Sequence, residues 1–344
     1  MSVQGGLDPG GSTLANIDLL LDLDTERAGW WKGGSFHFYV LGDAGSAPSP
    51  SARAGDVQTA RNIEAPDDIK LYEAYYQQRL FEGISFAIGL HDANTVFADI
   101  ATASVFHHSS FGIQPDISQA GPSIFPVAGM GVVLSADLAP RWLLEAGVYD
   151  GVPGDPGHPR GTRVHLGGDD GLFSIAQLTW RPGGGIAGGG TDWALGGWYD
   201  TAPVKDPSGM DFHTNYGAYS TFERRMWAGS SGAELSAFAQ VGFAMPERNS
   251  VERYLGAGVV WRGLSGGRPD DTLALAIGQA RASSALRAAE PELPPGEIAV
   301  ELHYSRAFAE GISLEPDFQY IRHPSAQGET RDARILALRL VLEF

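Results

Sequence analysis

Residues 334–344 read Arg-Ile-Leu-Ala-Leu-Arg-Leu-Val-Leu-Glu-Phe, and this stretch decides the fold. Every even position from 336 to 342 is Leu and position 344 is Phe, whereas the odd positions include Arg339 and Glu343. Alternation with period two predicts a β-strand with one fully apolar face. In a soluble protein that face would be half of a core, and in a membrane barrel it would face lipid while Arg339 faces a water-filled lumen.

The same alternation recurs along the chain. In each case the second face includes polar or small side chains. Several of these faces carry two or three charged side chains, and such strands cannot be buried on both sides, as a parallel α/β sheet would require. The sequence therefore predicts an all-β, antiparallel fold. The segments are 14–23, 84–90, 141–149, 254–262, 296–306 and 312–320.

The connectors alternate between short and long, which is typical of outer-membrane barrels with tight periplasmic turns and longer external loops. We therefore predict one transmembrane β-barrel domain over residues 1–344, in a bacterial outer membrane. No apolar run approaches the roughly 18 residues that a membrane helix needs. The short connectors are 80–83, 136–140, 229–232 and 308–311, and the long ones are 43–68, 92–124, 151–170, 201–213, 283–295 and 322–332.

The net charge of −17 makes nucleic acid a poor partner, because phosphate binding needs clustered Lys and Arg. The acidity fits solvated loops, a cation-rich pore, or loops bridged by cations near lipopolysaccharide. There is no Cys, so stability must come from strand hydrogen bonds and packing. Large aromatic residues near predicted strand ends suggest girdles at the membrane interfaces: Trp142, Trp180, Trp193, Trp198, Trp227, Trp261 and Tyr320.

A series of longer motifs resembles the OprB-type carbohydrate-selective porins over nearly the whole chain. The resemblance implies a 16-stranded barrel that passes monosaccharides such as glucose, with in-folded loops that narrow the lumen. The matching stretches are 71–78 (LYEAYYQQ), 89–94 (GLHDAN), 109–114 (SSFGIQ), 121–126 (GPSIFP), 147–155 (GVYDGVPGD), 236–243 (SAFAQVGF), 255–263 (LGAGVVWRG) and 314–321 (LEPDFQYI).

The count of membrane-spanning segments in the sequence is about fifteen, although single-chain bacterial barrels use even numbers. The segment 14–23 should run inward, so an outward strand should precede it, yet the residues before Gly10 are too few to span a membrane. No signal peptide is visible either. We therefore expect a truncated first strand and a barrel that is open or distorted between 14–23 and the last strand.

Enzyme and metal motifs are weak, so we expect a channel with no cofactor and no metal site. Gly183-x-Gly185-x-x-Gly188 lies between two predicted strands with no helix to receive a pyrophosphate. His107 and His108 are adjacent in a stretch read as extended, where their side chains would point apart. Loops 150–155 and 167–171 lack the EF-hand pattern. The alternatives to a porin are an outer-membrane barrel enzyme and a secreted β-rich protein that binds glycans.

Residues that alternate with the apolar face are the candidates for lining the pore and binding sugar. Hydroxyl groups of a sugar need polar partners, and its ring faces need flat apolar surfaces. An alternative is that most of these side chains only hydrate the lumen and pair with one another. The candidates are Glu73, Tyr75, Gln77, Glu145, Tyr149, Glu223, Arg225, Arg262, Glu301, His303, Glu315, Asp317, Gln319 and Arg339.

Segment 99–124 is a long loop with apolar content, which predicts that it folds back into the barrel as a constriction. Asp116 and Gln119 are the polar residues expected nearest the narrowest point. Expected partners are small sugars, outer-membrane lipid and lipopolysaccharide, and the barrel-assembly machinery, which would read Phe344. Association into homotrimers is left open.

Overall fold

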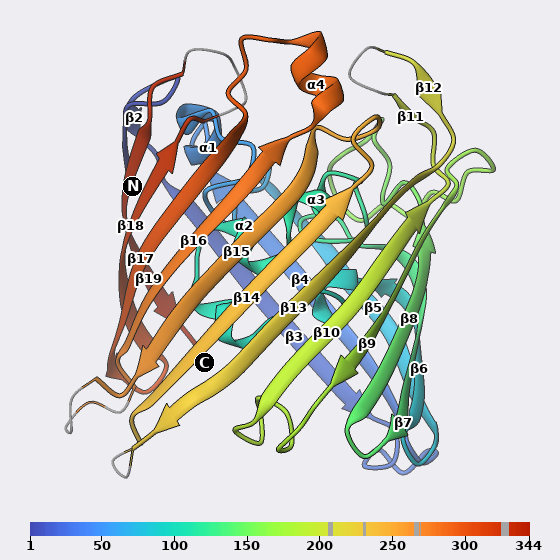
Figure 1. Ribbon diagram of the computed structural model, residues 1–344. Helices are drawn as coiled ribbons and strands as arrows, with labels where there is room; N and C mark the ends of the chain where they lie inside the picture. Colours follow the sequence, from blue (N-terminus) through green and yellow to red (C-terminus); the bar gives the residue numbers. More distant parts are fainter. Residues whose placement is uncertain (206–208, 230–231, 265–267, 269, 325–329) are drawn as a thin grey trace.

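The computed structural model describes residues 1–205, 209–229, 232–264, 268, 270–324 and 330–344, and this part of the chain is dominated by long strands that curl into a barrel (Figure 1). Fifteen described strands have eight residues or more. They are β3 (Leu14–Asp24), β4 (Gly34–Gly45), β5 (Asp68–Phe81), β6 (Ile84–His91), β7 (Gly129–Ala139), β8 (Trp142–Asp150), β9 (Leu172–Trp180), β10 (Thr191–Asp200), β13 (Asn215–Ala228), β14 (Glu234–Ala244), β15 (Val251–Arg262), β16 (Thr272–Ala282), β17 (Gly296–Ala309), β18 (Ile312–Arg322) and β19 (Ala333–Leu342).

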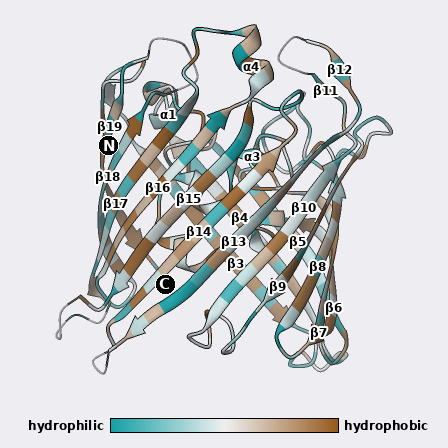
Figure 2. Ribbon diagram, in the orientation of Figure 1, coloured by the Kyte–Doolittle hydropathy of each residue, from teal (hydrophilic) through white to brown (hydrophobic). Residues whose placement is uncertain are grey.

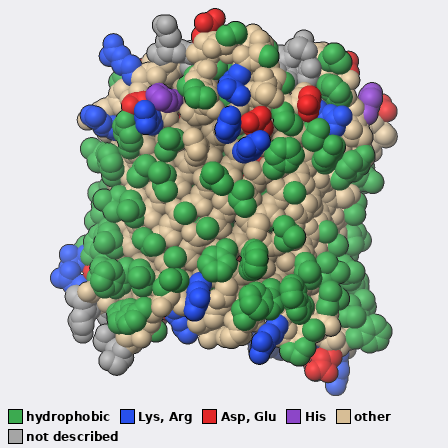
Figure 3. All heavy atoms as spheres, in the orientation of Figure 1, with side chains coloured by type: hydrophobic (Ala, Val, Ile, Leu, Met, Phe, Trp, Pro, Cys, Tyr) green, Lys and Arg blue, Asp and Glu red, His purple; other side chains and the backbone are tan. Residues whose placement is uncertain are grey.

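Each long strand pairs antiparallel with the next one along the chain, as the sequence predicted. In the last ladder Glu315 lies opposite Arg339, and both point inward, while Leu338 and Leu340 are exposed on the outer face. Hydropathy alternates along the strands in Figure 2. Hydrophobic side chains cover the wall in Figure 3, and charged ones gather towards its two ends. This is the surface that a lipid bilayer requires.

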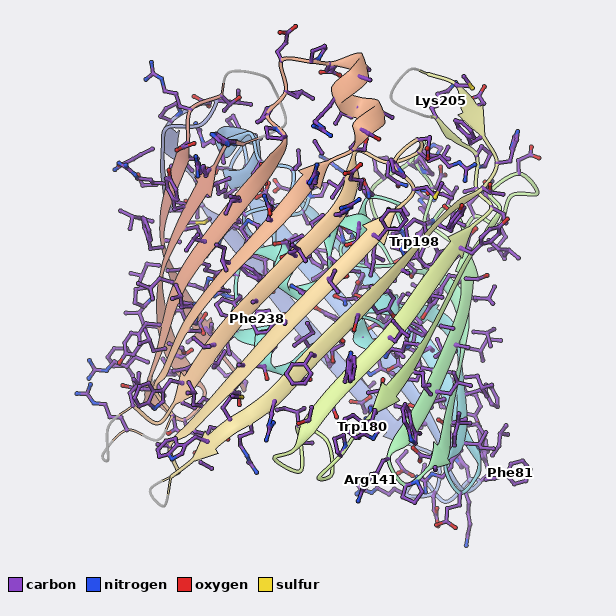
Figure 4. All side chains as sticks on the ribbon, viewed as in Figure 1. Phe81, Arg141, Trp180, Trp198, Lys205 and Phe238 are labelled. Carbon is purple, nitrogen blue, oxygen red and sulfur yellow. The ribbon has the colours of Figure 1, made fainter. Side chains whose placement is uncertain are left out.

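One end of the barrel carries the turns and the other carries the long loops. Phe81, Arg141 and Trp180 lie at the turn end, and Lys205 lies at the loop end (Figure 4). The alternation of connector length is only approximate. The β14–β15 connector on the loop side has only residues 245–250, whereas three connectors on the turn side are longer: 25–33, 181–190 and 263–271. Parts of three predicted connectors, at 206–208, 230–231 and 325–329, lie outside the described residues.

The remaining elements are short. Near the N-terminus are β1 (Ser2–Gln4) and β2 (Gly10–Gly11), and β11 (Val204–Lys205) pairs with β12 (Asp211–Phe212) in one loop. The helical segments are α1 (Pro50–Ala54), η1 (Ala93–Thr95), η2 (Ala101–Val105), α2 (Ser109–Gly112), α3 (Pro115–Ser118) and α4 (Ser284–Ala289). In the described ranges, no helix is long and apolar enough to cross a membrane.

The seam of the barrel lies between β19 and β3. The three-residue strand β1 pairs with β19 on one side and with β2, just before β3, on the other. Below β1, towards the turn end, no described ladder joins β3 to β19, and Leu19, Leu20 and Leu21 of β3 are exposed. The predicted irregularity at this seam and the count of fifteen spanning strands are therefore confirmed.

One predicted girdle residue has the opposite orientation. Trp198 is only 3% exposed and stacks on Phe173 inside the barrel, whereas Trp193 on the same strand is exposed on the outer face. The two residues are five positions apart, so their side chains must point to opposite faces of a strand. Trp142, Trp227 and Trp261 are exposed on the outer wall, as predicted.

Candidate functional site

Two long connectors enter the barrel instead of standing outside it: the outer loop, residues 46–67 between β4 and β5, and the constriction loop, residues 92–128 between β6 and β7. The helical segments of the constriction loop are visible through the wall in Figure 1. Phe106 and Phe111 of this loop pack against Phe238 of β14 and against small residues of β16, including Ala274 and Ala276. Burial of apolar side chains therefore favours the inward position of the loop.

Carboxylates of the barrel wall hold the constriction loop by its backbone. Glu223 of β13 accepts hydrogen bonds from the amides of Ala101 at 3.3 Å and Thr102 at 2.8 Å. Glu301 of β17 accepts from the amides of two consecutive residues, His107 at 2.7 Å and His108 at 2.9 Å. Such charge-assisted bonds are stronger than neutral ones, and they satisfy amides that the loop would otherwise bury without a partner.

At its start the constriction loop is fixed by a third carboxylate, since Glu73 of β5 accepts a hydrogen bond of 2.8 Å from the amide of Asp92. Neutral side chains add further anchors. Gln177 of β9 donates to the carbonyl oxygen of Val96 at 2.9 Å and accepts from the amide of Ala98 at 3.2 Å. Gln240 of β14 donates to the carbonyl oxygen of Ser110 at 3.0 Å.

The outer loop is bound to β17 and β18 in the same manner. Glu297 accepts from the amide of Val57 at 3.1 Å and from the side chain of Gln58 at 3.0 Å. Arg61 forms a buried ion pair with Asp317, 2.6 Å between Nη1 and Oδ1. A buried pair of this kind strongly restricts the geometry of both partners.

The two loops are also bound to each other. The amide of Asn62 donates to the carbonyl oxygen of His107 at 2.7 Å, and the amide of Ser109 donates to that of Thr59 at 3.0 Å. The wall, the outer loop and the constriction loop therefore form one connected unit near β17 and β18.

Asp116 of α3 lies fully buried against β14, where Gly242 provides the space for it. A Cβ atom at position 242 would lie 2.1 Å from both carboxylate oxygens of Asp116. Neither oxygen has a hydrogen-bond partner among the described residues. Burial raises the pKa of Asp116 to about 7, because water no longer stabilises the charged form.

The predicted pore residues fall into two groups in the structure. The first group is buried beneath or within the inward loops: Glu73, Asp116, Tyr149, Glu223, Glu301, His303, Asp317 and Gln319. The second group is partly or fully exposed: Tyr75, Gln77, Gln119, Glu145, Arg225, Arg262, Glu315 and Arg339. The sequence placed Asp116 and Gln119 on the inward loop and the other residues on the inner face of strands. Alternation alone does not show which of these strand positions a loop will cover.

On the turn side of the constriction loop the lumen is open and polar. A cavity of about 610 Å³ is lined there by Gln77 and Glu145 from the predicted set, and also by Arg79, Asp137 and Arg181. The sequence pattern did not identify Arg79 and Arg181 as pore-lining residues, because they lie close to strand ends, where the alternation of apolar and polar positions is hard to recognise. Above this cavity the ring of Tyr75 stacks on His37, with centroids 4.8 Å apart.

The lumen therefore offers polar side chains that can bind the hydroxyl groups of a solute, and a flat aromatic ring that can contact its apolar face. The two fixed loops make this lumen narrow.

Comparison with known proteins gives the family. The profile of the carbohydrate-selective porins of the OprB family matches residues 8–344. The chain belongs to the OprB family. Porin B of Pseudomonas aeruginosa is 22% identical over 391 residues, an alignment that covers 100% of this chain and 85% of that protein.

Solved structures show the same fold. OprB of Pseudomonas putida, in its high-pH structure, superposes with a TM-score of 0.85 at 17% identity, covering 100% of this chain and 91% of that one. The outer-membrane channel DcaP of Acinetobacter baumannii gives a TM-score of 0.52 at 12% identity, covering 90% and 81%. Membership of the OprB family confirms the predicted channel of the bacterial outer membrane for passive sugar diffusion, and with it the prediction that the protein is not an enzyme.

Proposed function

We propose that this OprB-family chain acts as one barrel domain in which the constriction loop and the outer loop restrict passage to sugars of about the size of glucose. The observation that carries the proposal is the set of wall carboxylates, Glu223, Glu297 and Glu301, that hold loop amides inside the lumen. A loop fixed at several points keeps one pore size, whereas a loose loop would admit larger solutes.

Sugar meets the exposed group of predicted residues, and the buried group together with Gln119 positions the loops. Arg225 and Arg262 both lie near Glu234, at 3.7 Å and 3.1 Å between the charged atoms, so this part of the lumen carries charges of both signs. Weak hydrogen bonds to such side chains orient a sugar without trapping it, because each polar group can exchange its partner for water. Two further partners belong to this proposal: lipopolysaccharide at the loop end of the barrel, and the barrel-assembly machinery, which would bind at Phe344.

Liposome swelling tests this function. Vesicles that carry the complete protein should swell faster in glucose than in a trisaccharide of the same osmolarity, and vesicles without protein should swell in neither. Equal rates for the two sugars would contradict selection by a narrow constriction. Absence of swelling in protein-containing vesicles would contradict the channel itself.

A further inference from the structure

Four buried side chains converge where the constriction loop meets the wall: His107 of the loop, Glu301 and His303 of β17, and Asp317 of β18. Their exposed fractions are 2%, 0%, 1% and 4%. One ligand-type atom from each lies within 4.8 Å of the others. His303 and Asp317 are direct partners in the β17–β18 ladder, and the ring of His107 lies edge-on to that of His303 with centroids 4.6 Å apart.

Three atoms at the centre of this cluster lack a hydrogen-bond partner among the described residues: Nδ1 of His107, Nδ1 of His303 and Oδ2 of Asp317. The two nitrogen atoms lie 4.0 Å and 3.8 Å from the Asp317 oxygen. These distances are too long for hydrogen bonds. Buried polar atoms are nearly always paired, so three of them around one point indicate a missing group between them.

In His107 and Asp317 the other polar atom of the side chain is occupied, which fixes the orientation of the free one. Nε2 of His107 lies 2.9 Å from a carboxylate oxygen of Glu315, and Oδ1 of Asp317 accepts from Arg61 at 2.6 Å. A histidine that binds a metal through one ring nitrogen commonly donates its other N–H to a carboxylate. His107 has this arrangement, with Nδ1 as the free atom.

We propose that His107 Nδ1, His303 Nδ1 and Asp317 Oδ2, with Glu301 as a fourth donor, bind one divalent transition-metal ion, with zinc as the expected occupant. Two imidazole nitrogens with carboxylate oxygens suit zinc, whereas magnesium and calcium prefer oxygen donors throughout. The three carboxylates of Glu301, Glu315 and Asp317 lie near two arginines, Arg61 paired with Asp317 and Arg339 opposite Glu315, so a cation also improves the local charge balance.

The sequence predicted no metal site, because it offered only the adjacent pair His107 and His108 as histidine candidates. His107 and His108 do not act together, because Nδ1 of His108 instead lies 2.9 Å from the hydroxyl of Ser110. The partner of His107 comes from β17, far away in the sequence, which adjacency could not reveal. A metal here ties the constriction loop to two wall strands, next to the ion pair of Arg61 with Asp317 that holds the outer loop.

The competing explanation is that the atoms of the cluster share a proton and bind no metal ion. Measuring the metal content of the protein separates these two explanations. The complete chain, without a polyhistidine tag, is purified in detergent, treated with a chelator and then given zinc or magnesium. We expect about one zinc ion to remain per chain after dialysis, and at zinc about 100-fold above its dissociation constant the unfolding midpoint should rise by about 5 °C. Magnesium should have no effect. Loss of all zinc with an unchanged midpoint would overturn the proposal.

Variants test the assignment of the ligands. His303→Gln and His107→Gln should each lose the bound zinc and the thermal shift, and the exposed His213→Gln should retain both. Retention of zinc by His303→Gln would show an adventitious site elsewhere and overturn the assignment. If these variants fail to fold, cobalt bound to the unaltered chain gives the answer. The intense visible absorption of tetrahedral cobalt is expected, and the weak bands of an octahedral ion bound by oxygen alone would contradict the proposed donors.

Discussion

The side chain of Gln119 in the constriction loop forms two hydrogen bonds with the backbone of Val251 at the start of β15. Its Nε2 donates to the carbonyl oxygen at 2.7 Å, and its Oε1 accepts from the amide at 2.8 Å. The amide side chain thus imitates a neighbouring strand, because it offers one donor and one acceptor to the backbone of Val251. It holds the far end of the loop, beyond the anchors at Glu223 and Glu301.

Changing Gln119 to Glu should loosen this end of the constriction loop. The new carboxylate oxygen would face the carbonyl oxygen of Val251, so one hydrogen bond becomes a repulsion. We expect a loss of stability of about 1–3 kcal/mol and faster entry of a trisaccharide in liposome swelling. Gln77→Glu makes the same chemical change in the open lumen, away from this contact, and should leave the unfolding midpoint unchanged. An unaltered trisaccharide rate in Gln119→Glu would show that this end of the loop does not set the pore size.

Glu223→Gln should weaken the central anchor of the same loop. The carboxylate now accepts from the amides of both Ala101 and Thr102, and a glutamine side chain can accept with only one of its two atoms. One buried amide then has no partner, which costs about 1–3 kcal/mol. Single-channel recording should show a larger or noisier conductance.

The matched control for this anchor is Glu234→Gln, since Glu234 faces the lumen from β14 and pairs with Arg262 at 3.1 Å. This change should alter ion selectivity with little effect on the passage of large sugars. Equal effects of the two substitutions on trisaccharide entry would argue against a specific role for the Glu223 anchor.

The sequence predicted the barrel well, because lipid imposes a pattern that local residues must satisfy. Leu336, Leu338 and Leu340 keep one face of the last strand apolar, with Arg339 on the other face, whatever the rest of the chain does. The same alternation put Glu223 and Glu301 in the lumen but could not show that they bind loop amides there. That outcome depends on a loop more than a hundred residues away, whose path no local pattern encodes. The apolar content of 99–124 indicated an inward fold, but gave no indication that residues 46–67 also enter.

Removal of Phe344 should lower the amount of protein in the outer membrane without changing the folded barrel. The Phe344 side chain is fully exposed and lies beyond the end of β19, so the ladder of β19 with β18 does not depend on it. If the barrel-assembly machinery reads this residue, membrane fractions should contain several-fold less protein at equal expression. The unfolding midpoint of the purified barrel should stay the same. Glu343→Gln, which keeps the terminal Phe, is the control, and normal membrane levels without Phe344 would make this residue incidental.

Asp116→Asn should remove a pH dependence of stability. In the folded chain burial raises the pKa of Asp116 to about 7, whereas in the unfolded chain the carboxyl has its ordinary value of 3.8. Between these two values the folded state binds a proton that the unfolded state has lost, so stability falls as pH rises from about 4 to 7. Above pH 7 the folded protein carries a buried charge that has no partner among the described residues.

Asparagine at position 116 copies the uncharged form at every pH. The variant should therefore already be more stable than the unaltered protein at pH 5, and the difference should grow as the pH rises. Between pH 5 and pH 8 it should increase by on the order of 3 kcal/mol. Asp169→Asn, in an exposed loop, should follow the unaltered protein across the whole range. Parallel curves for Asp116→Asn and the unaltered chain between pH 5 and pH 8 would show that this carboxyl keeps an ordinary pKa, and hence that water reaches it in the folded barrel.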